Sequence, residues 1–331
     1  MDVINKTDFG FFSFPHTNMH GFLITVCLVT ASVRFEDKKN SGTIVELAEP
    51  ILEDQYIASP EKSSMVVESD LAPFKPHTDI VFSSATAYSP SSGDEERWPV
   101  HLKVGDLEKT LVVYGDRKFR RGLFGKWRLM EMAPISRRKI LYEHAYGGSQ
   151  TRNGEYQHYP DNPIGTGHYS NDSTEEILAP TIEYPGETAH EIGSTCKPAG
   201  LGPIPRTWEP RTSLSGTYDE AWKKERWPLW PEDLSMDFFC CAPRDQQYPG
   251  FMNGNEKIEL TNLTPNRICN FQLPFRYTPF VSGVDEAGKE CHGKAKLDTV
   301  RIDLGNLKLT CVWRTALLIA DPSFIYVRNV G

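Results

Sequence analysis

One segment of the chain, GEYQHYPDNPIGTGHY at 154–169, carries residues of the types that bind metal ions. His158, Asp161 and His168 offer the imidazole and carboxylate groups that zinc prefers. Their spacing matches neither one face of a helix nor a zinc knuckle, and two prolines lie between them. The glycines do not form a phosphate-binding loop, because no Lys-Ser or Lys-Thr pair follows them. We therefore predict a turn-rich loop, and we expect neither a metal ion nor another cofactor.

Residues that could catalyse hydrolysis are present, but they form no recognisable motif. The segment HEIGS at 190–194 begins like a zinc-protease motif, yet Ser194 stands where the second histidine is needed. No Gly-x-Ser-x-Gly turn occurs in the chain. Asp and Glu number 44, and two of them from distant loops could meet in the fold as an acid and a base. A hydrolase with a site of dispersed Asp and Glu residues is therefore an alternative function.

The segment ESDLAPFKPHTDIVF at 68–82 also concentrates charged residues. Pro73 and Pro76 favour an extended backbone for the residues that precede them, so Lys75 is not expected in a helix. Asp70 could accept hydrogen bonds from nearby backbone N–H groups or pair with Lys75 across the turn. We interpret this segment as a rigid entry into a strand that begins near Thr78, and as architecture rather than a catalytic loop.

Composition and charge exclude several classes of protein. The chain has 331 residues, of which 39% are hydrophobic and 24% charged, as in folded domains. A formal charge of −8 argues against a general phosphate-binding surface, so we expect no nucleic-acid partner. The longest apolar segment, GFLITVCLVTASV at 21–33, is too short for a membrane-spanning helix and rich in β-branched residues. It predicts a buried strand, without insertion into a membrane.

The cysteines indicate the redox compartment. There are seven of them, an odd number, and Cys240 and Cys241 are adjacent. No Cys-x-x-Cys pair occurs. This pattern fits a reducing compartment better than a framework of disulfides.

Alternation of apolar and polar residues predicts two hairpins. In PVHLKVGDLEKTLVVYGD, at 99–116, the alternating strands flank a two-residue turn at Gly105-Asp106. TVRIDLGNLKLTCVW, at 299–313, repeats this pattern around Gly305-Asn306. A duplicated β-module and two unrelated hairpins both explain the likeness, and the sequence leaves the choice open.

The middle of the chain is of a different kind. Residues 134–250 hold thirteen of the 24 prolines and four of the seven tryptophans, which predicts an ordered, loop-rich region packed on a β core. One short helix is signalled near 218–227, with Thr217 as N-cap, Glu220 completing a capping box and Pro228 ending the helix. Packing of Tyr218 and Trp222 should hold it, since so short a helix is marginal alone.

These patterns together predict a mainly β protein. We expect two antiparallel, sandwich-like β-modules, a long Pro/Trp-rich loop region and one or two short helices. The first module covers residues 1–133, the loop-rich region covers 134–255, and strands at 256–331 complete or duplicate the β core.

Seven ordered motifs carry a resemblance to a known bacterial family. They are ILEDQYIASPEKSSMVVESDLAPFKPHTDIVF, LVVYGDRKFRR, YEHAYGG, NPIGTG, PAGLGPIPRTWEPR, GTYDEAWKKERWPLWPEDLSMDFFCCAPRDQ and ELTNLTP. Together they resemble a family of unknown-function domains encoded beside type VI secretion effectors and their spike proteins. The resemblance covers nearly the whole chain. The aromatic segment at 9–16 and the segment at 170–197 depart from the family pattern, and such variable segments are where a partner-specific surface is expected.

The resemblance implies an adaptor or chaperone in the bacterial cytoplasm. Such a protein would bind a cognate effector, often one with a PAAR domain, and assist its loading onto the VgrG spike. The resemblance carries no catalytic residues. A structural component that stays on the spike is a further alternative. Trp and Arg are favoured at protein interfaces, which makes seven residues of the loop region candidates for partner binding, while a small core under the loops is the alternative that we favour for most of them. They are Arg206, Trp208, Arg211, Trp222, Arg226, Trp227 and Trp230.

Overall fold

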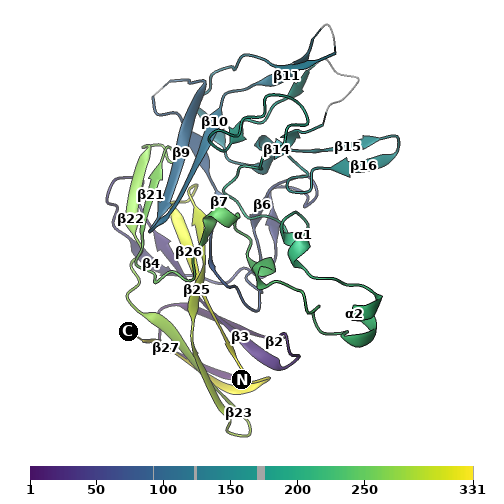
Figure 1. Ribbon diagram of the computed structural model, residues 1–331. Coiled ribbons are helices and arrows are strands. Elements are labelled where there is room, and N and C mark those ends of the chain that lie inside the picture. The colour runs from purple at the N-terminus through teal and green to yellow at the C-terminus, as the bar shows by residue number, and fades with distance from the viewer. Residues whose placement is uncertain (92, 123–124, 170–175, 331) are drawn as a thin grey trace.

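Strands dominate the fold, as the sequence predicts. The computed structural model describes residues 1–91, 93–122, 125–169 and 176–330. This part of the chain has two short α-helices, α1 (Arg211–Leu214) and α2 (Glu220–Glu225), and three 3-10 turns, η1 (Tyr142–His144), η2 (Met236–Phe239) and η3 (Arg244–Gln246). The mainly β class is therefore confirmed (Figure 1).

Three larger sheets contain most of the strands. The seven-stranded sheet has the order β2 (Gly10–Thr17), β3 (Leu23–Arg34), β26 (Lys308–Leu317), β25 (Lys296–Asp303), β7 (Thr78–Ser84) and β20 (Gln247–Tyr248), with β4 (Ile44–Leu47) beside β3. The five-stranded sheet has the order β19 (Ile182–Glu183), β10 (Leu107–Tyr114), β9 (Arg97–Val104), β21 (Lys257–Thr261) and β22 (Ile268–Gln272). The four-stranded sheet has the order β1 (Asp2–Asn5), β27 (Pro322–Val330), β23 (Thr278–Asp285) and β24 (Glu290–Lys294).

Smaller sheets extend this framework. A three-stranded sheet consists of β12 (Trp127–Leu129), β11 (Lys118–Arg121) and β18 (Glu176–Leu178). The two-stranded pairs are β13 (Arg137–Lys139) with β8 (Thr86–Tyr88), β14 (Tyr146–Gly147) with β17 (Thr166–Gly167), β15 (Ser149–Arg152) with β16 (Glu155–His158), and β5 (Gln55–Tyr56) with β6 (Met65–Val67).

The large sheets share one hydrophobic core. Trp313 of β26, Trp98 of β9 and Val281 of β23 belong to the same buried cluster, although they come from three different sheets. Strand β3 is buried along ten consecutive residues, which confirms the prediction of a buried strand at 21–33. Such a strand must be covered on both faces, and it therefore lies inside the molecule.

Strands from the beginning and the end of the chain pair directly. Most neighbours are antiparallel, but β25 lies parallel to β7, and β27 lies parallel to β1. Strand β21 pairs with β9 in the five-stranded sheet. Each large sheet thus combines residues from both ends of the sequence, while the division at 133 and 255 stays a prediction.

The two predicted hairpins differ in their loops. Leu107 pairs with Val104, so Gly105 and Asp106 form the expected two-residue turn, and Gly105 has a φ of 55°. In the second hairpin Asp303 pairs with Lys308, so the loop has four residues and the predicted two-residue turn is wrong. Oδ1 of Asp303 accepts hydrogen bonds from the amides of Gly305 and Asn306, which holds the longer loop. A common ancestry of the hairpins stays a prediction.

Two further features concern the cysteines and the helices. All seven cysteines are free. No helix in the described part of the chain has the length and apolarity that crossing a bilayer requires.

The first prediction concerns Gly10, where β2 and β4 meet along the same edge of β3. A Cβ at Gly10 would lie 2.0 Å from the backbone oxygen of Ala48. Because backbone cannot move aside cheaply, Gly10→Ala should lower the free energy of unfolding by about 2–3 kcal/mol, measured by urea denaturation. Gly42→Ala is the matched control, since no atom lies within 4 Å of its Cβ position. Equal stability of the two variants would contradict the packing described.

Candidate functional site

The acidic residues and the lysine of the segment at 68–79 are buried rather than exposed. The Lys75 side chain is inside the protein, with Nζ 2.7 Å from Oδ2 of Asp79 and 3.1 Å from Oγ1 of Thr299. Asp79 also accepts hydrogen bonds from the backbone amides of Cys241 and Ala242. Burial alone would lower the pKa of Lys75, but the charge of Asp79 and smaller contributions from neighbouring acids, among them Asp298 and Glu68, together outweigh burial and raise the pKa. Lys75 is therefore a charged structural residue.

The acids of this segment have partners on distant strands. Oδ1 of Asp70 lies 2.6 Å from Nη2 of Arg301, and its Oδ2 accepts a hydrogen bond from the amide of Ile51. Of the two partners proposed for Asp70, the structure thus has a backbone amide and not Lys75. Beside them Arg314 pairs with Asp298 at 2.6 Å and donates to the carbonyl oxygen of Asp70. Burial raises the pKa of Asp298, and the charge of Arg314 opposes that rise.

Two of the predicted partner-binding residues belong to the same network. Glu68 forms two ion pairs: its Oε1 lies 2.8 Å from Nη1 of Arg211 and 2.9 Å from Nε of Arg206. Arg211 is buried and also donates to the carbonyl oxygens of Ile204 and Phe238. Arg206 is partly exposed. Arg211 therefore holds the loop region against the segment at 68–79. Of these two arginines, Arg206 is the one that a partner protein could contact.

Four other predicted residues lie together on a projecting arm. We name residues 217–233 the α2 arm, because α2 lies within it and contributes no buried residue to the core. The arm is closed at its base by Thr217, whose hydroxyl donates to Asp233 at 2.7 Å. Figure 1 shows it extending away from the sheets, at the lower right.

Contacts inside the arm hold its shape. Nε1 of Trp222 donates to the carbonyl oxygen of Leu229 at 2.8 Å, and its ring meets Tyr218 edge to face. The predicted packing of Tyr218 and Trp222 is confirmed. The predicted N-cap is wrong, because Asp219 and not Thr217 accepts the hydrogen bond from the amide of Trp222. Thr217 is used at the base of the arm instead.

The arm is also tied to the turn between β2 and β3. Nη2 of Arg226 donates to the carbonyl oxygen of Met19 at 3.0 Å, and the ring of Trp230 lies 5.1 Å from that of His16. Trp227 does not take part in these contacts and is 68% exposed. Tyr218, which the sequence did not single out for binding, is 52% exposed. The sequence did contain a signal for Tyr218, since it lies on the same helical face as Trp222, one of the residues predicted to bind a partner.

Trp208, the remaining predicted residue, is structural. It is 4% exposed and packs edge to face against Tyr142. The candidates thus separate into a buried pair, Trp208 and Arg211, and a surface set in which Trp227 is the most exposed. Whether the surface set binds a partner stays a prediction.

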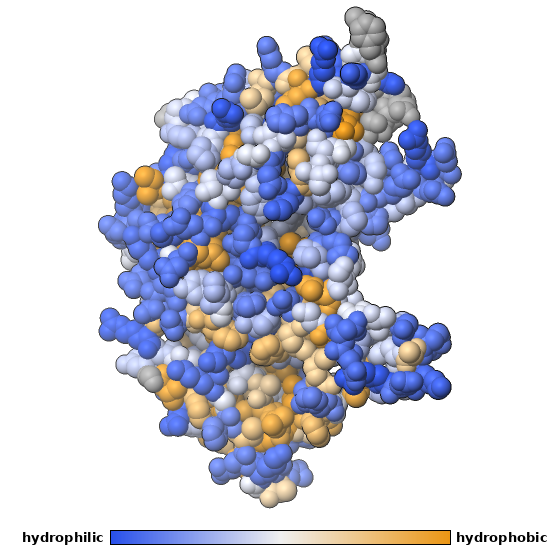
Figure 2. Space-filling model, viewed as in Figure 1, coloured by the Kyte–Doolittle hydropathy of each residue, from blue (hydrophilic) through white to orange (hydrophobic). Residues whose placement is uncertain are grey.

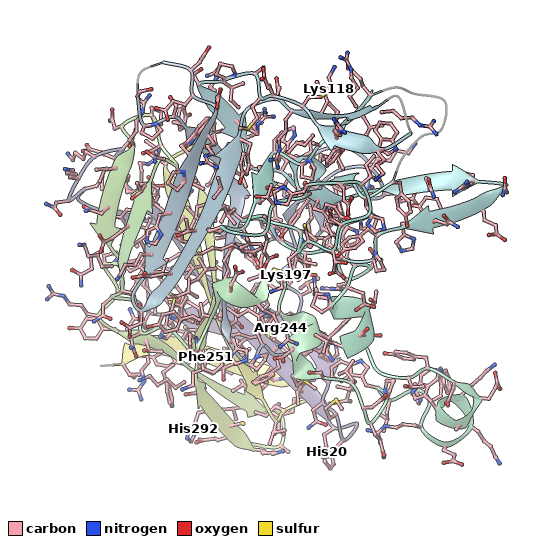
Figure 3. The ribbon with its side chains drawn as sticks, turned by 45° about the horizontal axis from the view of Figure 1, so that its top comes forward. His20, Lys118, Lys197, Arg244, Phe251 and His292 are labelled. Carbon is pink, nitrogen blue, oxygen red and sulfur yellow. The ribbon has the colours of Figure 1, made fainter. Side chains whose placement is uncertain are left out.

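A cavity of about 340 Å³ lies within the loop-rich region, beside η3. Lys197 and Arg244 lie on its wall, near the centre of the molecule (Figure 3). Asp161 and Glu209 also line it. Burial and then the charge of Glu209 raise the pKa of Asp161. Burial opposes the ionisation of Glu209, but hydrogen bonds from Thr212 and Ser213 outweigh it and lower that pKa.

A buried lysine contacts the acid at the edge of this cavity. Nζ of Lys109 lies 2.8 Å from Oδ1 of Asp245 and 2.8 Å from Oε1 of Gln246. Tyr184 donates to the other oxygen of Asp245 at 2.9 Å. Burial lowers the pKa of Lys109 to about 8, and the charge of Asp245 only partly offsets this.

The residues considered as metal ligands lie apart. His158 is on the exposed β15–β16 hairpin and stacks on Tyr156, whereas Nδ1 of His168 is 2.8 Å from the hydroxyl of Tyr146. Asp161 lines the cavity described above. Within the described ranges, no group of three or more His, Cys, Asp or Glu side chains could hold a metal ion. Residues 170–175 of the variable segment at 170–197 lie outside the described residues.

Comparison with protein families identifies the group to which the chain is related. Residues 20–314 match the family described as "Uncharacterized protein conserved in bacteria (DUF2169)". The chain belongs to this family. No curated protein and no solved structure matches it. The family is thus one of unknown-function bacterial domains, and membership gives no activity.

The second prediction tests the buried network. Lys75→Met leaves Asp79 as a buried carboxylate without its cation, so the free energy of unfolding should fall by about 3–5 kcal/mol in urea denaturation. Lys62→Met, at an exposed lysine, should change it by less than about 0.5 kcal/mol. A Lys75→Met protein as stable as the Lys62→Met protein would show that this ion pair is not needed.

The third prediction uses the pKa of Lys109. Between pH 8 and 10.5 the folded chain binds fewer protons at Lys109 than the unfolded chain does, so this residue makes folding more favourable as the pH rises. The free energy of unfolding of the wild type, minus that of Lys109→Met, should therefore increase by about 2–3 kcal/mol over this range. Titration of other groups is shared by both proteins and cancels. A difference that stays constant with pH would contradict the lowered pKa.

Proposed function

We propose that this protein is a type VI secretion adaptor that binds a cognate effector in the bacterial cytoplasm and assists its loading onto the VgrG spike. The seven ordered motifs support this proposal, since they resemble domains encoded beside such effectors. Family membership agrees with it at a coarser level, because the family is bacterial and uncharacterised. The effector is expected to be a secreted toxin, in some cases one with a PAAR domain.

The observation that carries the proposal is the α2 arm. Its own hydrogen bonds and its contact with Met19 hold it in place, yet it leaves Trp227 68% and Tyr218 52% exposed. Large aromatic side chains on a rigid projection favour protein binding, because each buries much apolar surface at little entropic cost. Figure 2 shows a hollow on the same side of the molecule, between the β15–β16 hairpin and the arm. An effector segment that enters this hollow would meet the arm.

The mechanism is reversible binding. The adaptor covers an aggregation-prone surface of the effector, and the effector gains stability as the adaptor concentration exceeds the dissociation constant. Loading onto the spike requires that the complex dissociate. The affinity of the adaptor for the effector must therefore be high enough to protect the effector and low enough to release it at the spike. No catalytic step is needed for either event.

A hydrolase is the second candidate, and the pair Asp161 and Glu209 favours it. The two carboxyl groups line the cavity of about 340 Å³, and their pKa values are shifted in opposite directions. Opposite shifts are the arrangement in which one carboxyl group acts as an acid and the other as a base. A spike component that is fired with the effector is the third candidate, and it would be found in the culture medium.

The fourth prediction tests the adaptor function. Co-expression with the products of neighbouring genes should yield a stoichiometric complex with an effector whose solubility depends on this protein. The double variant Tyr218→Ala/Trp227→Ala should weaken the complex at least tenfold, because exposed aromatic anchors contribute about 2 kcal/mol or more each. Circular dichroism should show that the variant is folded.

Tyr277→Ala is the matched control. Tyr277 is also exposed, at 58%, but it precedes β23 and lies outside the arm. Its loss should leave binding unchanged. Failure to co-purify with any neighbouring product, by a protein that is monomeric and stable alone, would overturn the adaptor proposal and favour the hydrolase.

A further inference from the structure

A small cavity of about 140 Å³ lies at the corner where the chain passes from β24 to β25. Lys294, the last residue of β24, and Lys296, the first residue of β25, both line it, and we name it the lysine cavity. The lining also contains Lys75, Arg314 and Asp298, which belong to the buried network described above. It therefore has four cations and one carboxylate. The α2 arm contributes no residue to this cavity, so the cavity is a separate feature of the molecule.

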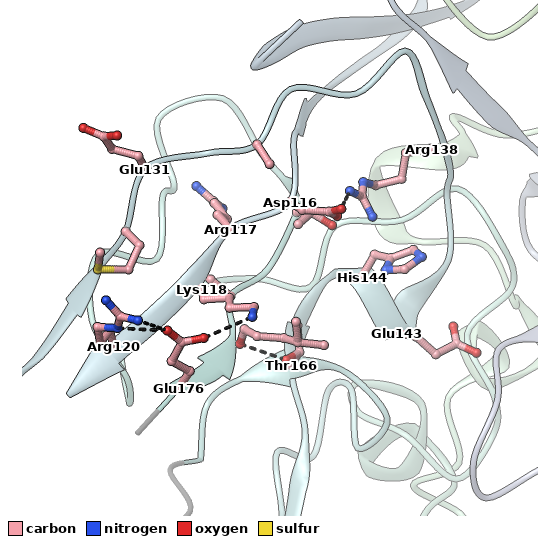
Figure 4. A pocket seen from close by; sticks show the side chains of 15 residues that line it. Asp116, Arg117, Lys118, Arg120, Glu131, Arg138, Glu143, His144, Thr166 and Glu176 are labelled. Carbon is pink, nitrogen blue, oxygen red and sulfur yellow. Dashed lines mark hydrogen bonds and ion pairs between the residues drawn. The ribbon is translucent and has the colours of Figure 1, made fainter. Parts of the chain in front are cut away.

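A larger cavity beside β11, of about 530 Å³, shows the contrast. Four Arg or Lys and four Asp or Glu side chains line it, and each of its cations has a carboxylate partner. Figure 4 shows Asp116 in contact with Arg138. It also shows Glu176 in contact with Lys118 and Arg120. The positive charges of the larger cavity are thus neutralised within the protein, whereas those of the lysine cavity are neutralised only in part.

The two lysines at the corner are the cations without a partner. The two buried cations of the lysine cavity are each paired with a carboxylate, as described above. Lys294 and Lys296 are both exposed, and in the described part of the chain neither side chain forms an ion pair or a hydrogen bond. Two accessible positive charges are therefore available to a ligand at this cavity.

Strand pairing places another positive charge beside Lys296. This residue lies directly opposite Arg314 in the ladder between β25 and β26, and like charges in such positions destabilise a sheet. Asp298 balances the charge of Arg314, whereas no carboxylate in the described chain pairs with Lys296. An anion bound beside Lys296 would therefore stabilise this part of the sheet. In a chain whose formal charge is −8, such a local excess of cations favours a negatively charged ligand.

Apolar side chains line the same cavity. Phe74 is 48% exposed, and Phe251 (Figure 3) is half-buried, with the centroid of its ring 5.8 Å from Nζ of Lys296. This cation–π contact holds the ammonium group of Lys296 beside the cavity. Pro73 and Pro76 restrict the backbone on either side of Phe74, so ordering its ring against a ligand costs little conformational entropy. The cavity therefore offers positive charge and apolar surface side by side.

We propose that the lysine cavity binds a carboxylate that is carried on an apolar group. The ammonium groups of Lys294 and Lys296 pair with the carboxylate, and Phe74 and Phe251 cover the apolar group. A cavity of about 140 Å³ is smaller than the pockets that enclose drug-sized ligands, so it admits the carboxylate and its nearest apolar atoms rather than a nucleotide. Inorganic phosphate is disfavoured, because it would place polar oxygens against the phenyl rings.

Two sources supply such a group. One is a free organic acid, and the other is a polypeptide in which Asp or Glu lies beside an apolar residue. Both present a carboxylate next to apolar surface, and ammonium groups recognise the two in the same way. The inference does not depend on the adaptor function, because it uses none of the arm residues.

Binding is measured by isothermal titration calorimetry on the full chain with three probes: hydrocinnamate, its uncharged amide hydrocinnamamide, and the tetrapeptide acetyl-Gly-Glu-Phe-Gly-amide. We expect saturable binding of one carboxylate ligand per chain, with the uncharged amide bound about tenfold more weakly. Binding of the peptide identifies a polypeptide segment as the source, and binding of hydrocinnamate without the peptide identifies a free acid. Equal affinity for hydrocinnamate and its amide, or no saturable binding of either carboxylate at millimolar concentration, overturns the proposal.

The fifth prediction locates the site with the double variant Lys294→Gln/Lys296→Gln. It should weaken the binding of the carboxylate about fivefold or more, because both of its cationic partners are lost, and added salt should reduce this difference. Lys39→Gln/Lys62→Gln is the matched control, since it removes two charges from exposed lysines outside the cavity and should leave binding unchanged. Lys294→Arg/Lys296→Arg should retain binding, because it retains the charge. Circular dichroism should show that all three variants are folded.

Phe74→Ala tests the apolar half of the site independently. It should weaken the binding of hydrocinnamate about threefold, since less apolar surface of the ligand is buried, and the preference for the acid over its amide should remain. Phe22→Ala is the matched control, because Phe22 is 65% exposed and does not line the cavity. If the double lysine variant and Phe74→Ala both bind as well as their controls, the ligand is bound elsewhere and the assignment of this cavity is wrong.

Discussion

The pairing of Lys75 with Asp79 is the interaction on which the rest of this structure depends. Both side chains are shielded from water, and a buried charge is tolerated only when an opposite charge and hydrogen bonds surround it. Asp79 fixes the backbone at Cys241, and neighbouring ion pairs fix β25 through Arg301 and the loop region through Arg211. One short segment thereby sets the position of the middle of the chain relative to the sheets.

The aromatic and arginine residues of the loop region therefore have two different roles. Arg211 and Trp208 are buried and stabilise the fold, whereas the α2 arm is stabilised by its own hydrogen bonds and leaves Trp227 exposed. Rigid scaffolds commonly present binding residues on such projections, because a segment that is already ordered loses little conformational entropy when it binds a partner.

Much of the fold follows from short-range patterns in the sequence, and the candidate site follows from them only in part. The hairpin around Gly105 and the strand at 21–33 were predicted because alternation and turn chemistry are local. The loop after Asp303 was missed because a side chain competes for its amides, and the helix cap was misplaced because Thr217 is engaged by Asp233. The partner of Asp70 on β25 could not be read from spacing, since ion pairs between distant strands leave no local pattern.

The parallel pairing of β7 with β25 also determines when this chain can fold during its synthesis. Lys75 and Thr299, which meet at this pairing, are 224 residues apart. At about 5–20 residues per second, a ribosome needs roughly 10–45 s to deliver the second after the first. During that interval β7 leaves the ribosome without its neighbour, with an apolar face uncovered. The native seven-stranded sheet therefore cannot assemble until β25 has been synthesised.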